Sequence, residues 1–107
     1  MYIDFNAGNK AYKLRLNIKN TVALEKMINC NPLMIFGNGD RLPTISEMVY
    51  ILHFSLQQYQ HGITVNDTQE IFEEWLNDGN TPTDFIQIII DIYRASGIIS
   101  QESNEKN

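Results

Sequence analysis

The chain has 107 residues with 43% apolar and 20% charged side chains, which fits one soluble globular domain that needs neither disulfides nor a metal to fold. Residues 1–53 carry six basic and four acidic side chains, whereas residues 54–107 carry two basic and nine acidic ones. The acidic second half argues against binding of nucleic-acid phosphates. A single cysteine, Cys30, excludes an intramolecular disulfide. No signal peptide is expected, and the most apolar window, residues 85–93, is too short to cross a membrane.

Two strands are predicted at the N-terminus, over residues 2–5 and 11–18. Apolar and polar side chains alternate from Tyr12 to Ile18, which is typical of a strand with one buried and one solvated face. Residues 6–10 supply a turn, so the two strands are expected to form a hairpin. Because a lone hairpin is marginally stable, its apolar face should pack on helices.

A first helix is predicted from Asn20 or Thr21, either of which can cap it, to about Cys30. Pro32 disfavours helical conformation at the residue before it and ends this helix. The link that follows contains a turn at residues 37–40 and has an apolar first half, which should pack under the next helix. The link side chains expected there are Leu33, Ile35 and Phe36.

The longest helix is predicted over about 16 residues after Thr44. Thr44 and Glu47 have the spacing of a capping box, in which each side chain binds the backbone N–H of the other residue. Gly62 can close the helix in a left-handed conformation. One face of this helix carries an apolar stripe, formed by Ile45, Met48, Val49, Leu52, Leu56 and Tyr59. Since Tyr50 and Phe54 lie opposite the stripe, the helix is either packed between other elements or half exposed for a partner.

A third helix is predicted from Asn66, paired with Gln69 as its cap, to about Asp78. Its apolar side consists of Thr68, Ile71, Phe72, Trp75 and Leu76. Its acidic side is either a solvated face or a docking surface for a basic protein.

The last helix is predicted to start at Thr81 and Pro82, to run to about Ser96, and to be closed by Gly97. Its apolar side chains cover an arc of roughly 200°, wider than the ~100° stripe of a surface helix. It is therefore either the buried centre of a bundle or shares one flank with another chain. The fold class predicted for the whole chain is α+β, mainly α: an N-terminal β-hairpin packed on a bundle of about four helices.

No group of residues predicts catalysis, and we expect no catalytic residue, no cofactor and no metal site. His53 and His61 lie about 12 Å apart along one helix and cannot share an ion, and each is expected to be a helix-surface or capping residue. A single globular domain is expected over residues 1–99, followed by a disordered polar tail over residues 100–107.

Several short motifs, together with the end of the last helix, carry a resemblance to a known family. The motifs are Asn31-Pro32-Leu33, Leu42-Pro43, Ile51-Leu52-His53, Leu56-Gln57-Gln58-Tyr59, His61-Gly62-Ile63 and Asp91-Ile92-Tyr93-Arg94-Ala95-Ser96-Gly97. Over about residues 20–99, the chain resembles the small tail assembly chaperones of long-tailed (siphovirus-type) phages and prophages of Gram-positive bacteria.

The resemblance implies a non-catalytic role in virion morphogenesis. Such a chaperone binds the tape measure protein and keeps it soluble in the cytoplasm of the bacterial host. It is displaced as the tail tube protein polymerises, and it is absent from the mature virion. The family often makes a second, C-terminally extended form by frameshifting. Neither nucleic acid nor a membrane is an expected partner.

Helical geometry supplies candidate partner-binding residues, on two separate surfaces. They are Tyr50 and Phe54 on the long helix, or Ile86, Ile90 and Tyr93 on the spare flank of the last helix. Two other functions remain open. One is a self-assembling tail or connector subunit that buries the same flanks in a homo-oligomer, and the other is an acidic regulator that binds a basic protein.

Overall fold

The N-terminal hairpin and the four α-helices predicted from the sequence are present in the computed structural model, which describes residues 1–36 and 42–100. The predicted class, α+β and mainly α, is confirmed. The elements are β1 (Ile3–Ala7), β2 (Lys10–Leu14), α1 (Ile18–Ile28), the 3-10 helix η1 (Pro32–Phe36), α2 (Ile45–Leu56), α3 (Val65–Asn77) and α4 (Asp84–Ala95). The turn predicted at residues 37–40, and the predicted tail apart from Ser100, lie outside the described residues.

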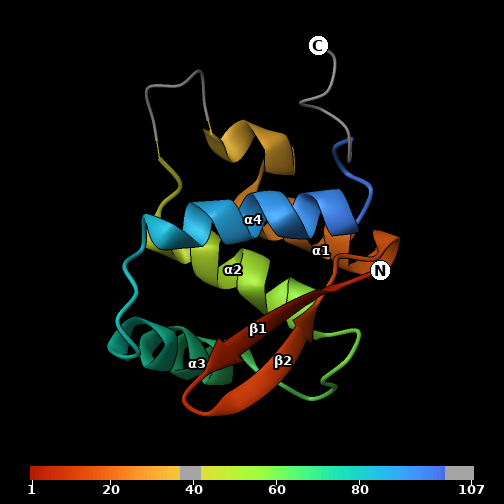
Figure 1. Cartoon of the computed structure of the whole chain (residues 1–107). Helices are drawn as coiled ribbons and strands as arrows, with labels where there is room; N and C mark the ends of the chain where they lie inside the picture. The colour runs from red at the N-terminus through yellow and green to blue at the C-terminus, as the bar shows by residue number, and fades with distance from the viewer. Residues whose placement is uncertain (37–41, 101–107) are drawn as a thin grey trace.

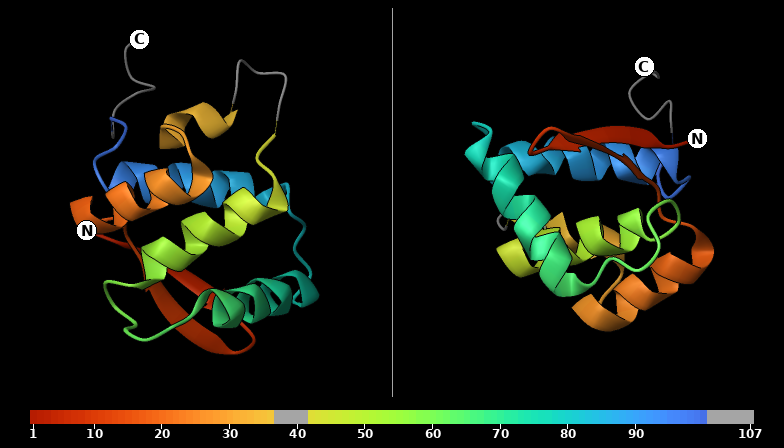
Figure 2. Two further views of the ribbon diagram at one scale, coloured as in Figure 1. Left: turned by 180° about the vertical axis from the view of Figure 1, so that it is seen from behind. Right: turned by 90° about the horizontal axis from the view of Figure 1, so that it is seen from below.

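The elements form two layers. The hairpin and α4 lie on one side of the molecule, and α1, α2 and α3 lie on the other (Figures 1 and 2). Within the second layer α2 lies between α1 and α3 and packs against both. The expectation that the hairpin packs on helices is confirmed, since β1 contacts α3 and α4 while β2 contacts α2.

The hairpin is antiparallel and turns through two residues, Gly8 and Asn9, which both have positive φ angles (56° and 68°). Two successive left-handed residues give a turn whose twist matches that of the flanking strands. The predicted second strand was too long, because pairing stops at Leu14. Leu16 is still buried, as the alternation predicted, but Ile18 belongs to α1 and is 80% exposed.

The helix caps differ from prediction at three of four N-termini. The Asn17 side chain accepts a hydrogen bond from the Asn20 N–H (2.8 Å) and starts α1 three residues early. At α3 the cap is Thr64, not Asn66. At α4 the helix begins at Asp84 instead of Pro82, because the backbone N–H groups of Asp84 and Phe85 bond three residues back, to the carbonyls of Thr81 (2.9 Å) and Pro82 (3.0 Å), and so form turns. The Asp84 carboxylate still accepts from the N–H of Thr81 (2.8 Å).

The capping box at the start of α2 is confirmed. Thr44 Oγ1 accepts from the Glu47 N–H at 3.0 Å, and Glu47 Oε1 accepts from the Thr44 N–H at 2.9 Å. The helix ends at Leu56, earlier than predicted, and the Gln57 side-chain amide donates to the carbonyl of Ile63 in the connector (3.0 Å). Side chains on several sides of α2 are buried, as expected for a helix between other elements. They are Met48, Val49, Ile51, Leu52, His53, Ser55 and Leu56.

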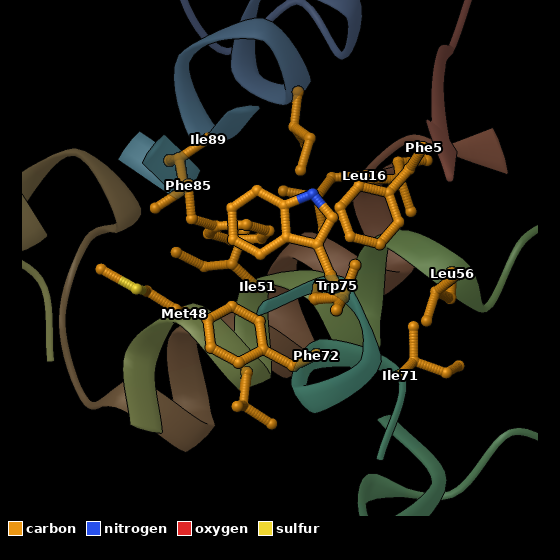
Figure 3. Packing of buried hydrophobic residues seen from close by; sticks show 14 of the residues in the cluster. Phe5, Leu16, Met48, Ile51, Leu56, Ile71, Phe72, Trp75, Phe85 and Ile89 are labelled. Carbon is orange, nitrogen blue, oxygen red and sulfur yellow. The ribbon is translucent and has the colours of Figure 1, made fainter. Parts of the chain in front are cut away.

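An aromatic cluster joins the two layers at the centre of the core (Figure 3). The Trp75 ring of α3 lies 5.8 Å from Phe5 of β1, 5.7 Å from Phe72 and 5.5 Å from Phe85 of α4, measured between ring centroids. Aromatic side chains each bury roughly 150–250 Å², so this cluster supplies much of the apolar burial that holds hairpin and helices together.

Candidate functional site

A depression with a largely apolar lining lies between α2 and α3, with a volume of about 380 Å³, and is called here the α2–α3 groove. The side chains that line it are Ile45, Ser46, Val49 and Tyr50 of α2, and Val65, Gln69, Phe72, Glu73, Leu76 and Asn77 of α3. The two helices that form its walls pack against each other and lie side by side (Figure 2).

The apolar side chains of α3 that line the groove lie along one face of this helix. Val65, Phe72 and Leu76 recur at i, i+7 and i+11, so they form one stripe along the helix. This stripe lies beside the fully core-facing positions Thr68 and Trp75. At 1.5 Å per residue it extends for roughly 17 Å, which is about three turns of a partner helix.

The α2 wall is short and partly exposed. Only residues from the first two turns of α2 line the groove, and Ile45 among them is 48% exposed. The sequence placed Ile45 in the apolar stripe of the long helix, most of which is buried in the structure. The structure leaves it at the edge of the groove instead, because it is the first residue of α2 and no other described element covers it fully.

A second depression, the α1–α2 groove, has a volume of about 440 Å³ and a polar lining. Its side chains are Asn17, Lys19, Asn20, His53, Phe54, Gln57, Gln58 and His61. Phe54 packs edge-on against the neighbouring His53 ring, with 4.9 Å between the ring centroids. Tyr50 and Phe54, predicted as one partner-binding face, are therefore one helical turn apart but line different grooves.

The prediction that His53 lies on the helix surface or caps the helix was wrong, because its side chain is buried (9% exposed). Its Nδ1 lies 3.0 Å from Thr68 Oγ1, whose hydroxyl donates to the Thr64 carbonyl (3.0 Å). Because the Thr68 hydroxyl proton is donated to Thr64, Thr68 Oγ1 accepts a hydrogen bond from Nδ1–H of His53. This bond links α2 to α3. Burial lowers the pKa of the His53 imidazole from 6.5, because desolvation disfavours the charged ring.

The candidate flank of α4 is covered to different extents. Ile86 and Ile90 are half-buried. Tyr93 is completely buried, which contradicts its place among the partner-contacting residues. Its hydroxyl donates to the Pro32 carbonyl (3.0 Å) and its ring packs edge-on against Phe36 at 6.3 Å, so η1 covers this part of α4.

Of the three link side chains expected under α2, Ile35 is buried, Leu33 is exposed and Phe36 is half-buried against α4.

Nothing in the described part of the chain assembles a metal site: residues 1–36 and 42–100 contain no group of three or more His, Cys, Asp or Glu side chains placed to hold an ion. Over the same residues, each helix is too short or too polar to traverse a lipid bilayer.

Comparisons with known proteins give a family without an assigned role. The chain belongs to the family of unknown function DUF6096, whose model matches residues 4–107. No curated protein and no solved structure matches this chain.

Proposed function

We propose that this member of the family is a non-catalytic tail assembly chaperone that binds a helical segment of the tape measure protein in the α2–α3 groove. The observation that supports the proposal is the groove itself, with the half-buried Val65 and Leu76 side chains on α3, the buried Phe72 ring between them, and the exposed Ile45 side chain opposite. The motif resemblance to phage tail assembly chaperones supplies the identity of the partner.

The dimensions of the groove suit helix-in-groove recognition, in which an amphipathic helix inserts its apolar face. A tape measure protein is a long helical rod whose apolar stripes are exposed before the tail tube assembles. Many copies of a small domain bound along one rod protect it through avidity, although each contact is weak. Weak individual contacts also allow the polymerising tail tube protein to displace the chaperone.

Self-assembly as a tail or connector subunit is a second candidate, favoured by a separate observation. Apolar side chains outside the groove are strongly exposed, among them Ile18 on α1, Met34 on η1 and Leu42 before α2. A homo-oligomer could bury them. Light scattering at several protein concentrations separates the two functions, because a closed stable ring favours the structural subunit and a monomer or small oligomer favours the chaperone.

Co-expression with the tape measure protein tests the proposal. Wild-type chain should keep that protein in the soluble fraction, whereas Ile45→Asp and Tyr50→Asp should lose most of this effect, because a carboxylate in the groove opposes burial of an apolar helix. Phe54→Asp should retain it, since Phe54 lines the other groove. Ile18→Asp is the matched control, because Ile18 is an exposed isoleucine remote from the groove.

Circular dichroism establishes that each variant is folded. Full solubility of the tape measure protein with both folded groove variants would exclude the α2–α3 groove as its binding site. Loss of solubility with Phe54→Asp alone would move the site to the α1–α2 groove.

A further inference from the structure

We infer that the helix bound by the α2–α3 groove is basic, with lysine or arginine on the flank of its apolar stripe that faces α3. This inference rests on the proposed function and adds the charge of the partner segment to it. It comes from the distribution of charge over the two helices that form the groove.

All formal charges on these two helices are negative. α2 and α3 together carry five carboxylates, on Glu47, Asp67, Glu70, Glu73 and Glu74, and neither lysine nor arginine. Among residues 1–36 and 42–100, Glu73 is the only charged side chain that lines the groove. The last turn of α3, which ends at the groove residues Leu76 and Asn77, also lacks a basic side chain to offset the negative end of its dipole.

Three other acids on or just after α3 make contacts within the chain. Asp67 caps α3 through the Thr64 N–H (3.0 Å), and Asp78, just after the helix, accepts from the Gly8 N–H (2.9 Å). Glu74 packs against Gly8 so closely that a Cβ at that position would lie 2.6 Å from Glu74 Oε1. These acids therefore fix the start of α3 and the position of the hairpin turn.

Glu73 has no such role. Within residues 1–36 and 42–100, neither a hydrogen bond nor an ion pair engages its carboxylate. It stands on the α3 wall between the polar residues Gln69 and Asn77, one turn to either side. A lysine or arginine on the flank of a bound helix could lay its aliphatic stem over this edge of the groove, the rim, and bring its cation close to the Glu73 carboxylate.

The charge at the rim should act more on partner selection and association rate than on total affinity. Complementary rim charges raise on-rates and suppress like-charged partners, and they are screened by salt. The apolar stripe supplies the affinity, and the acidic wall selects among apolar helices. An acidic amphipathic helix of the same shape would be rejected.

Three synthetic helical peptides test the inference against the full-length chain. Each is about 14 residues long, spans about four turns and carries the same leucine stripe, with Lys, Gln or Glu at every flanking position. Binding is measured by fluorescence anisotropy at about 0.05 M and about 0.5 M salt, since screening over this range separates electrostatic from apolar contributions.

The Lys-flanked peptide should bind about tenfold more tightly than the Glu-flanked one at low salt, and the difference should shrink at high salt. Glu73→Gln should weaken binding of the Lys-flanked peptide about two- to fivefold and leave the Gln-flanked peptide unchanged. Glu25→Gln, which removes an exposed acid on α1, is the matched control and should have no effect on either peptide.

Two contrary results are distinguishable. If the Gln-flanked and Lys-flanked peptides bind equally well, the partner segment is not selected by charge, and the groove still binds an apolar helix. If none of the three peptides binds the folded chain, both the charge preference and the groove as a helix-binding site are overturned.

Discussion

The imidazole of His53 lies where α2 meets α3, and its ring also lines the α1–α2 groove. Two side-chain contacts hold it, one with the Thr68 hydroxyl and one with the Phe54 ring. Protonation would place a charge in a largely desolvated position and remove the acceptor capacity of the ring. The stability of the fold therefore depends on the protonation state of this ring through the cost of desolvating its charge, although the bond from Nδ1–H to Thr68 is present in both states.

This dependence predicts a specific loss of stability in acid. The pKa of His53 is lowered in the folded state, so between that lowered value and 6.5 the unfolded chain binds more protons than the folded chain. The free energy of unfolding should therefore fall as the pH decreases from about 7 to about 5. Urea denaturation at a series of pH values should show a smaller fall for His53→Gln than for wild type.

His61→Gln is the control for that experiment, because His61 is exposed in the described chain. It should keep the pH dependence of wild type. Parallel loss of stability in His53→Gln and wild type would show that His53 does not titrate differently in the two states.

Tyr93 illustrates what the helical pattern alone could not predict at the level of a residue. A helix with apolar side chains over most of its circumference gives no signal for which flank the rest of the chain covers. The flank that carries Tyr93 is covered by η1, whose Pro32 carbonyl lies 61 positions away in the sequence. A local pattern holds no information on such a contact.

At the scale of elements, the sequence predicted the existence and order of the helices but placed most of their starts a few residues away. The capping box of Thr44 and Glu47 was found because no other capping residue competes with it. Before α1 and α3, several Asn and Thr residues follow one another, and any of them has the chemistry of a cap. The choice among them depends on where Leu16 and Ile63 must be placed by tertiary packing.

The capping box also predicts a local effect on the groove, since Ile45 and Ser46 directly follow Thr44. Thr44→Ala should lower the free energy of unfolding by about 1 kcal/mol, because the Glu47 N–H loses its acceptor. Thr83→Ala is the matched control, as Thr83 occupies the corresponding position of α4 but its side chain makes no capping bond. It should change stability by less than about 0.5 kcal/mol in urea denaturation.

Equal destabilisation by the two alanine substitutions would show that the hydrogen bond of the Thr44 side chain does not stabilise α2. If instead the expected difference is seen, Thr44→Ala should also weaken binding of the Lys-flanked peptide, because fraying of the first turn displaces Ile45 from the groove.

At the scale of the whole molecule, the α2–α3 groove could be predicted only in part. Periodicity assigned Ile45, Val49, Phe72 and Leu76 to apolar faces, which is correct for each helix taken alone. Val65 lay just before the third helix, which was predicted to start at Asn66, although it is the first residue of α3. Whether an apolar side chain meets the core or a groove depends on how far apart two helices pack, and this is a tertiary property.

The excess of apolar helical surface, by contrast, was evident in the sequence, and the structure shows where part of it lies. Exposed isoleucine, methionine and leucine side chains remain on α1, η1 and the start of α2. The acidic regulator that was left open has less support, because Asp67 and Asp78 make hydrogen bonds within the chain. Glu73 lines the α2–α3 groove and is therefore placed to select a bound helix.

The most direct measurement of the central claim is a nuclear magnetic resonance titration of the labelled chain with helical segments of the tape measure protein. If the α2–α3 groove binds such a segment, chemical-shift changes should be concentrated at Val49, Tyr50, Phe72 and Leu76, while α1 residues such as Val22 remain unchanged. Changes confined to the exposed face of α1, or no changes with any segment, would contradict a chaperone that binds through this groove.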